Sequence, residues 1–296
     1  MKTVRTIIGI LVAVALLAVA GFFGYSQLVE KGIIHIKPGE TTSKENVITE
    51  DFRGIIITAD VSIVTVCPSE DGKVRLEFTG NRSITHEYRF EFDGEEKEQN
   101  LIIEEKDNRS WIDRMLPVAE SLEIKLFLPK THPEGPERNY GKLKINAKTG
   151  NCSIKSVPIE WTEVSTFSGN IEISSVTCRG PVGAYSESGN LKMSDIRAQD
   201  CGANTSSGNI EIRNVIAEWG GFLIITESGN VTFEDCDSKL ESYLRTQSGN
   251  VRGTLLSGKR FVTNTAIGKI QVPESEGDVV FTIETTTGNI VIEVKK

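Results

Sequence analysis

The chain has 296 residues, of which 38% are hydrophobic and 25% are charged, and its formal net charge is -8. This composition is typical of a globular protein and excludes an intrinsically disordered chain. The acidic balance, without a long Lys/Arg cluster, argues against nucleic-acid binding, because phosphates need a basic surface.

Residues 1–24 are predicted to form an N-terminal membrane anchor or signal segment. Lys2 and Arg5 precede an uncharged apolar run from Ile7 to Phe23. As a helix this run would measure about 26 Å, against about 30 Å for a hydrocarbon core. Positive charge before the run predicts a cytoplasmic N-terminus, a single-pass transmembrane helix and an extracytoplasmic C-terminal region. The alternative is a cleaved signal peptide and a secreted protein, since "AVA" at Ala18–Ala20 fits a small-x-small cleavage site.

Two regions separate this segment from the rest of the chain. Residues 25–46 predict a juxtamembrane linker, because Gly32, Pro38 and Gly39 lie among polar residues. Residues 47–140 contain strand patterns such as "IIITADVSIVTV", "KVRLEFTG" and "SLEIKLFLP". We expect this β-rich region to be the start of the repeat structure that follows, or a cap on it.

One motif then recurs through residues 141–296. Its turn glycine stands at a spacing of 19 to 21 residues, at Gly150, Gly169, Gly189, Gly208, Gly229, Gly249, Gly268 and Gly288. Positions two and four after the glycine are mostly apolar, as in Ile171 and Ile173, and the position between them is mostly polar, as in Glu172. This period of two predicts strands with one buried face.

The repeats predict the fold class. A unit of about 20 residues has too little apolar surface to fold alone, so each unit must stack on the next. We therefore predict an all-β fold. It is a single-chain parallel β-solenoid, or β-helix, of eight coils, in which each coil pairs with the next one in the sequence.

An asparagine follows most turn glycines. These residues are Asn151, Asn170, Asn190, Asn209, Asn230, Asn250 and Asn289, and Lys269 interrupts the series. Stacked in register, the side-chain amides are expected to form a hydrogen-bonded structural ladder. Asn and Gly also tolerate the left-handed backbone that we expect at the corner.

Hydroxyl residues stand three and one positions before most turn glycines, as in Thr166 and Ser168. A stacked array of this kind is found on ice-binding faces. Here both positions share parity with the apolar position five before the glycine. We therefore expect both hydroxyls to point inward and to bond the backbone near the corner.

The sequence assigns no catalytic, cofactor-binding or metal-binding residue, and no cofactor. GxSxG, Walker and HExxH motifs are absent from it. The outward carboxylates Glu172, Glu211, Glu234 and Asp235 recur, as they do in solenoid enzymes that cleave acidic polysaccharides. We interpret them as a solvated face, so any binding site is expected at variable outward positions such as Phe167.

The five cysteines form no CxxC pair, and their number is odd. Cys152 and Cys236 occupy apolar positions of the repeat and are expected to be small core residues. Cys67, Cys178 and Cys201 have no role that the sequence decides. A disulfide or a reactive thiol stays open for them.

The repeated "SGNI" and "SGNV" units follow "IIITADVSIVTVCPSEDGKVRLEFTG" and "LEIKLFLPK". This arrangement resembles the bacterial β-strand-repeat family labelled "putative adhesin", a domain of unknown function, over residues 47–296. The resemblance implies a cell-envelope β-solenoid, often behind one N-terminal membrane segment. It implies no particular ligand and no functional residue.

These features together predict a non-enzymatic, membrane-anchored extracytoplasmic solenoid that acts as an adhesin or envelope scaffold. Its expected partners are the membrane and a cell-surface glycan or envelope protein, and not nucleic acid. A regulatory domain that senses envelope stress by binding a peptide, lipid or partner protein is the alternative, and a polysaccharide-acting enzyme is a weaker one. The repeats run to the end of the sequence, so we expect self-association through the C-terminal edge of the solenoid.

Overall fold

The structure is a computed structural model of the chain. It describes residues 42–81, 83–92, 98–109, 122–131, 139–274 and 277–295. The chain divides into two units, Met1–Glu40 and Thr41–Lys296, and every described residue belongs to the second. The predicted membrane segment therefore lies outside the described residues. Among those that are described, no helix is long and apolar enough to cross a membrane.

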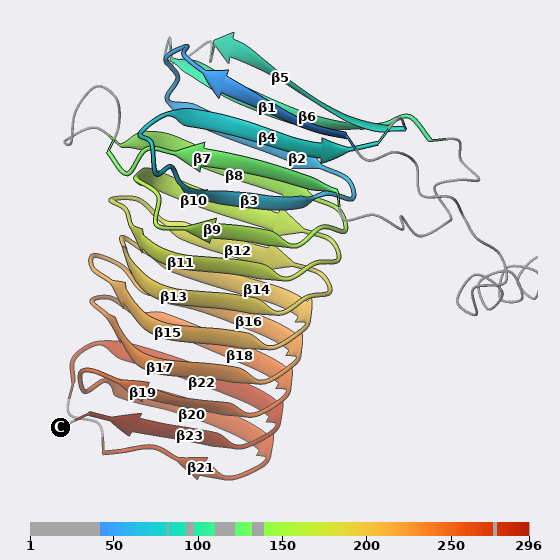
Figure 1. Cartoon of the computed structure of the whole chain (residues 1–296). Helices are drawn as coiled ribbons and strands as arrows, with labels where there is room; N and C mark the ends of the chain where they lie inside the picture. Colours follow the sequence, from blue (N-terminus) through green and yellow to red (C-terminus); the bar gives the residue numbers. More distant parts are fainter. Residues whose placement is uncertain are drawn as a thin grey trace, which may run out of the picture. The chain divides into compact units, whose positions relative to one another are not determined.

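The described residues form 23 strands and no helix (Figure 1). The strands before the repeats are β1 (Thr42–Ile48), β2 (Gly54–Ala59), β3 (Ile63–Pro68), β4 (Val74–Gly80), β5 (Ile84–Phe92), β6 (Gln99–Asp107) and β7 (Glu123–Leu128). The first strands of the repeats are β8 (Tyr140–Ala147), β9 (Cys152–Lys155), β10 (Ile159–Thr166), β11 (Ile171–Thr177), β12 (Val182–Ser186), β13 (Leu191–Ala198), β14 (Cys201–Ser207) and β15 (Ile210–Ala217). They are followed by β16 (Phe222–Ser228), β17 (Val231–Ser238), β18 (Ser242–Ser248), β19 (Val251–Leu255), β20 (Arg260–Ile267), β21 (Ile270–Gln271), β22 (Val280–Thr287) and β23 (Ile290–Val294).

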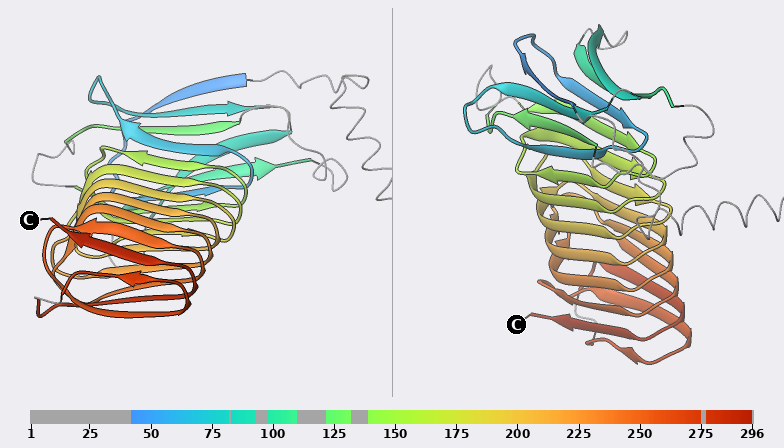
Figure 2. Two further views of the ribbon diagram at one scale, coloured as in Figure 1. Left: turned by 90° about the horizontal axis from the view of Figure 1, so that it is seen from below. Right: turned by 45° about the vertical axis from the view of Figure 1, so that its right-hand side comes forward.

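The strands form two sheets that face each other across one core (Figure 2). Sheet A has the order β1-β4-β7-β3-β9-β11-β13-β15-β17-β19-β23-β21, and sheet B has the order β20-β22-β18-β16-β14-β12-β10-β8-β2-β6-β5. Each repeat gives one strand to sheet B, turns at its glycine and gives the next strand to sheet A. The fold is therefore the all-β parallel solenoid that the repeats predict.

Equivalent positions of successive coils pair directly across the strands. Ile171 pairs with Leu191 in sheet A, and Val164 pairs with Ala184 in sheet B. These four side chains are at most 1% exposed, so the alternation of buried and outward positions is confirmed. Gly253 is an exception in an apolar column. A Cβ there would lie 2.3 Å from the ring of Phe233, which fills the space.

The last two coils are stacked in the reverse of their sequence order. β22 lies between β18 and β20, and β23 lies between β19 and β21 (Figure 1). The coil of Gly288 is thus inserted between those of Gly249 and Gly268. The prediction that each coil pairs with the next in sequence is wrong here. Because all coils present the same columns, the repeat pattern alone does not set their order.

The other end of the stack is built differently. β6 and β7 run parallel to β2 and β3, outside them. β4 and β5 then pair antiparallel with β7 and β6, and β1 pairs antiparallel with β4. The described stack therefore extends beyond residues 141–296 and ends in antiparallel strands (Figure 2).

The predicted linker, residues 25–46, overlaps the first strand. Residues 42–46 belong to β1, so the linker assignment is wrong for them. This strand reads "TSKENVI" and is mostly exposed. It lacks a buried face and is held by its backbone pairing with β4, which is why its hydrophobic pattern was too weak to predict it.

The turn glycines are required by a close approach of two backbones. A Cβ on Gly189 would lie 1.9 Å from the carbonyl oxygen of Gly169, and one on Gly208 would lie 2.1 Å from that of Gly189. The left-handed backbone occurs elsewhere, six residues after the glycine, at Ser156, Ser175, Asp195, Asn214 and Asp235, where φ is 49° to 56°. The left-handed residues that we expected at the corner therefore lie at a second bend of the coil.

The hydroxyl residues divide into two groups. Those three before the glycine point inward, and their Oγ atoms donate to the carbonyl of the stacked glycine, as Thr205 does to Gly189 at 3.0 Å and Thr226 to Gly208 at 3.1 Å. Those one before it, such as Ser207, are exposed. The prediction that both groups point inward is wrong for the second, because the corner turns the backbone.

All five cysteines are free, and four of them are buried. Burial raises the pKa of Cys152 and Cys178 to about 12 and that of Cys236 to about 11. It also raises the pKa of Cys201. Their thiolates are therefore scarce at neutral pH, and a disulfide among the five is not present.

We expect one fast-reacting thiol in the native protein. Cys67 is the only one of the five that is not buried, so a thiol reagent at pH 8 should modify it well before the others. Mass spectrometry after limited labelling checks this. Modification of any of the four buried cysteines at the same rate, in a chain that remains folded, would contradict the burial of that residue in the core.

Candidate ligand-binding groove

The predicted asparagines form a ladder along one corner of the solenoid. Each Oδ1 accepts from the backbone N–H of the asparagine in the next coil, at 2.8–2.9 Å, through Asn151, Asn170, Asn190, Asn209, Asn230, Asn250 and Asn289. Contacts between two side-chain amides are longer, 3.4 Å from Asn230 to Asn209 and 3.2 Å from Asn250 to Asn230. The donors are thus mainly backbone groups, and the ladder connects neighbouring coils.

Lys269 ends this ladder. Its backbone N–H donates to Asn289 Oδ1 at 2.8 Å. The coil of Gly268 is the outermost in the stack, so no further coil needs an acceptor from this position. The residue that interrupts the series in the sequence therefore lies at its end in space.

A groove of about 550 Å³ lies on the outer face of sheet B. Its lining residues come from six neighbouring strands, β10, β12, β14, β16, β18 and β22. Neighbouring strands are about 4.8 Å apart, so the groove is about 24 Å long. These dimensions suit an extended ligand.

The floor of the groove is one outward column, six positions before the turn glycine. Pairing aligns Glu163 with Gly183, Gly183 with Gly202, Gly202 with Leu223 and Leu223 with Tyr243. The two glycines place no side chain on the surface. The groove is therefore lowest over β12 and β14 and is bounded by larger side chains at both ends.

Tyr185 lies across this floor. A Cβ on Gly183 would be 2.7 Å from Tyr185 Cε2, and one on Gly202 would be 3.6 Å from Tyr185 Oη. The ring therefore packs on Gly183, and its hydroxyl reaches toward Gly202. Tyr185 is nevertheless 42% exposed. A ring held on the backbone of a sheet has few rotamers left, so it is a preorganised contact surface.

Other aromatic and apolar groups continue the surface. The Nζ atom of Lys142 lies 4.2 Å from the centre of the Trp161 ring, a cation–π contact. Leu223 is 54% exposed. At the far end Tyr243 Oη donates to Glu284 Oε2 at 2.7 Å, and this hydrogen bond raises the pKa of Tyr243.

The charge of the groove is acidic. Glu163, Asp200 and Glu241 are among its lining residues, and none of those that the structure describes is Lys, Arg or His. Glu163 pairs with Lys144 at 2.9 Å, and Asp200 Oδ1 accepts from Gly221 N at 3.1 Å. The groove thus offers mainly hydrogen-bond acceptors beside exposed apolar surface.

The outward residues singled out in the sequence lie elsewhere. Phe167 is 60% exposed, at the corner after β10, and does not line the groove. The predicted outward carboxylates belong to sheet A, where they face cations: Glu172 and Lys192 at 4.0 Å, Glu211 and Arg213 at 3.7 Å, Glu234 and Arg213 at 3.0 Å, Asp235 and Lys295 at 2.5 Å. These carboxylates therefore lie on the other sheet and do not line the groove.

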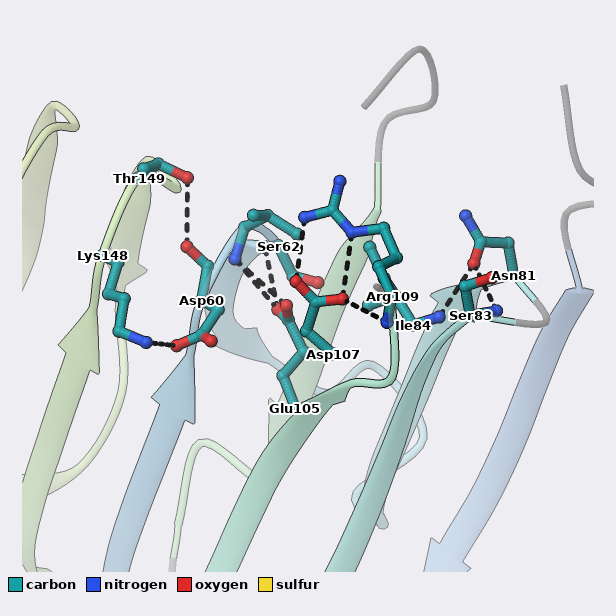
Figure 3. Close-up of polar contacts among 11 residues, drawn as sticks. Asp60, Ser62, Asn81, Ser83, Ile84, Glu105, Asp107, Arg109, Lys148 and Thr149 are labelled. Atoms are coloured by element: carbon teal, nitrogen blue, oxygen red, sulfur yellow. Dashed lines mark hydrogen bonds and ion pairs between the residues drawn. The ribbon is translucent and has the colours of Figure 1, made fainter. Parts of the chain in front are cut away.

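A Ser–His–Glu group occurs near the opposite end of the stack. Ser62 Oγ lies 2.9 Å from His86 Nε2, but the carboxylate of Glu105 accepts from the backbone N–H groups of Val61 and Ser62, at 3.1 and 2.9 Å (Figure 3). Ser62 is fully buried, so no substrate reaches its hydroxyl. A Cβ on Gly150 would lie 1.9 Å from the Ser62 carbonyl oxygen. Ser62 thus continues the glycine column, and Glu105 binds its amides.

His86 has a structural environment as well. Its ring stacks on Phe78 with the centroids 5.0 Å apart, and burial lowers its pKa. A neutral ring fits that apolar contact. Within the described ranges, no three His, Cys, Asp or Glu side chains are placed to hold a metal ion.

The profile of the Toastrack DUF4097 family matches residues 52–219 and 180–296 of this chain. The chain belongs to this family. No curated protein matches the Toastrack chain. Similar solved structures include a putative adhesin from Bacteroides fragilis, at 15% identity and a TM-score of 0.52, covering 88% of this chain and 100% of that one.

Two further structures have a lower TM-score. A putative cell adhesion protein from Clostridium sporogenes is 12% identical, with a TM-score of 0.39, over 86% of this chain and 100% of that one. A putative lipid binding protein from Parabacteroides distasonis is 13% identical, with a TM-score of 0.42, over 87% and 98%. At these identities the likeness shows the fold alone.

The groove was not predicted from the sequence of this Toastrack chain. A signal for it exists in the repeat alignment, six positions before the turn glycine, where Gly183 and Gly202 stand between Glu163 and Leu223. Two consecutive glycines in an outward column predict a depression. The inward columns dominate the repeat pattern, and the outward residue at which we expected a site, Phe167, stands two before its glycine, in another column.

Proposed function

We propose that this Toastrack protein is a non-enzymatic binding module of the cell envelope, an adhesin, and that the groove on sheet B binds a carbohydrate chain. The observation that carries the proposal is the exposed ring of Tyr185, packed on Gly183 beside carboxylates on a rigid sheet. Binding sites on rigid sheet scaffolds need no ordering of the protein when the ligand arrives.

A saccharide fits this combination of groups. The C–H faces of a sugar ring pack on aromatic rings, and its hydroxyls donate to carboxylates and to the tyrosine oxygen. The groove supplies Tyr185 and Trp161 for the first contact and Asp200 and Glu241 for the second. Its acidic character favours neutral or amino sugars, because an acidic polysaccharide would meet the like charges of Asp200 and Glu241.

The cellular location is part of the proposal. Residues 1–24 have the charge and hydropathy of a signal anchor, which would tether the solenoid outside the cytoplasm. Secretion after cleavage at "AVA" is the alternative. The name of the Bacteroides fragilis structure, a putative adhesin, agrees with a role at the cell surface.

The proposal predicts that Tyr185→Ala weakens glycan binding at least about tenfold, since truncating a central aromatic hot spot costs about 2 kcal/mol or more. A glycan array identifies the ligand, and titration calorimetry of the wild type and the variant measures the loss. Phe167→Ala is the matched control, because Phe167 is an exposed aromatic residue outside the groove.

The outcomes separate the candidate functions. Loss of glycan affinity in Tyr185→Ala but not in Phe167→Ala supports the groove as the binding site. Loss in Phe167→Ala but not in Tyr185→Ala would place the binding site at the corner instead. Binding of no saccharide, with binding of lipid vesicles or extended peptides, would favour the sensing function. Cleavage of a bound polysaccharide would contradict the non-enzymatic role.

A further inference from the structure

The repeats have a second edge, opposite the glycine corners. There each strand of sheet A bends into the next strand of sheet B along the chain (Figure 1). The bends after β15, β17 and β19 each expose a large apolar side chain: Trp219 is 66% exposed, Leu240 58% and Leu256 42%. Because β15, β17 and β19 are neighbours in sheet A, these side chains belong to adjoining coils. We call the three residues the apolar ridge.

The backbone that carries the apolar ridge is hydrogen-bonded within the stack. Gly220 O, beside Trp219, accepts from Leu240 N at 2.9 Å. Leu256 N donates to Cys236 O at 2.9 Å. The exposed side chains therefore project from fixed bends whose backbone already has partners, and a ligand would meet them through their side chains.

The same edge is polar at neighbouring coils. The bend after β11 exposes Arg179, and the bend after β13 exposes Gln199. The apolar ridge is thus a local patch with polar residues beside it. Patches of this kind mark sites of contact with a partner or a membrane.

We propose that the apolar ridge enters the surface of a lipid bilayer, so that the solenoid lies with this edge on the membrane. Tryptophan suits the membrane interface, because its ring is apolar and its N–H can donate to a headgroup. The two leucines add apolar area that lipid covers. This contact goes beyond glycan binding, and it rests on the membrane location proposed above only for the identity of the bilayer.

The size of the apolar ridge favours lipid over a folded partner. Neighbouring strands are about 4.8 Å apart, so three bends span only about 10 Å along the edge. A stable interface between two folded proteins buries about 1,200 Å² or more in total, which so narrow a ridge does not supply against a rigid surface. Lipids are fluid and close around projecting side chains, so they cover the whole exposed area.

The chain before β1 is long enough to allow this orientation. Residues 25–41 separate the predicted anchor from β1, and a chain of this length spans at most about 58 Å. In sheet A, β19 lies nine strands from β1, a distance of about 43 Å. An anchor in the same bilayer therefore leaves the apolar ridge within reach of its surface.

The charges beside the apolar ridge are mixed. Lys239 and Glu241 are both exposed, and Glu218 pairs with Arg197 at 3.6 Å. Neither sign dominates, so the edge has no preference for anionic lipid. Salt screens contacts between charges but not apolar contacts. We therefore expect binding to zwitterionic lipid, with little dependence on salt.

Flotation with phosphatidylcholine vesicles tests the proposal on residues 41–296, which form one compact unit without the predicted anchor. Trp219→Ala should raise the lipid concentration for half-binding at least about fivefold, because interfacial binding scales with buried apolar area. Phe167→Ala is the matched control, since Phe167 is 60% exposed at the opposite edge, and it should leave binding unchanged. Thermal midpoints of both variants should stay near that of the wild type, because exposed substitutions change stability little.

Tryptophan fluorescence supplies a second readout, on the full chain reconstituted in vesicles. The sequence has three tryptophans, so replacing Trp111 and Trp161 by Phe leaves Trp219 as the only one. Brominated lipids should quench its emission. In the same background, Trp219→Phe with Phe167→Trp moves the probe to the glycine corner, and quenching should be lost.

Four results overturn the proposal. They are a wild type that binds no vesicles at millimolar lipid, undiminished binding in Trp219→Ala, equal quenching of a probe at Phe167, and binding that needs anionic lipid and disappears in salt. Loss of vesicle binding in Tyr185→Ala but not in Trp219→Ala would place the lipid in the groove and also contradict it. Glycan binding can fail while vesicle binding persists, and the reverse, so the two proposals are tested separately.

Discussion

Gly229→Ala is expected to destabilise the solenoid by about 3 kcal/mol, the upper range for overpacking a filled site. The new Cβ would lie 1.9 Å from Gly208 O and 2.6 Å from Gly208 C, distances that no rotamer change relieves because both atoms are backbone. Separating the coils instead would break the hydrogen bond from Asn230 N to Asn209 Oδ1, now 2.9 Å long. For a unit of this size the thermal midpoint should fall by about 6–12 °C.

The control for this prediction is Gly202→Ala. A Cβ on Gly202 has its nearest neighbours at 3.6 Å, Tyr185 Oη, and 3.9 Å, Leu223 O, which are ordinary contacts. Its stability should change by no more than about 0.5 kcal/mol. Thermal unfolding followed by circular dichroism compares the two variants. Equal midpoints would show that close backbone approach does not determine the glycine of the corner.

Asp237→Ala is expected to cost about 3–5 kcal/mol, as breaking a buried ion pair does. Lys259 is 2% exposed, and its Nζ lies 2.7 Å from Asp237 Oδ1, 2.6 Å from Ser238 O and 2.9 Å from Ser257 Oγ. Without the carboxylate, the ammonium group stays buried and uncompensated. The residues between β19 and β20 are those that step past the inserted coil, so this pair also holds the crossing in place.

A second variant tests the asymmetry of the pair. Lys259→Met removes the charge that is almost fully buried, whereas Asp237 keeps the hydroxyl of Ser257, at 2.6 Å, and the N–H of Ser238, at 2.9 Å. It should therefore cost less than Asp237→Ala. In the double variant no unpaired charge remains, so part of the loss should be restored. Additive losses in urea denaturation would contradict the coupling.

The pair should also make stability depend on pH in the acid range. Burial alone would raise the pKa of Asp237, but the ammonium group of Lys259 and the hydroxyl of Ser257 outweigh it and hold the pKa below its usual value. A carboxyl with a depressed folded-state pKa contributes stability above its unfolded value, about 4, and loses it as the pH falls through the folded value. The stability difference between the wild type and Asp237→Asn should therefore shrink below about pH 4.

The sequence predicted most of the positions whose side chains face the core. The period of two around Ile171 and Ile173 and the spacing of the glycines suffice for a stacked solenoid, because a burial pattern repeated in every coil has few other solutions. The sequence also placed the asparagines on one column. The reason that we expected for the turn glycines, a left-handed backbone at the corner, is wrong. They are required because the backbones of two coils approach closely, as at Gly208 and Gly229.

The candidate site was less predictable for a related reason. Tyr185 and Gly183 are near neighbours in sequence, but Leu223 and Tyr243 reach the groove only through the pairing of β12, β14, β16 and β18. Outward positions carry no burial constraint that repeats from coil to coil. Their meaning depends on which side chains stand beside them in the neighbouring strands.

By itself the sequence determined that this chain buries two faces of short strands and stacks them as a parallel solenoid. The tertiary structure decided the order of the coils at both ends and the groove across sheet B. The physical reason is that the columns of Val251, Ile290 and Ile270 are interchangeable. Equivalent coils fit one another in any order, so connections such as residues 256–259, fixed by Lys259 and Asp237, select the order that forms.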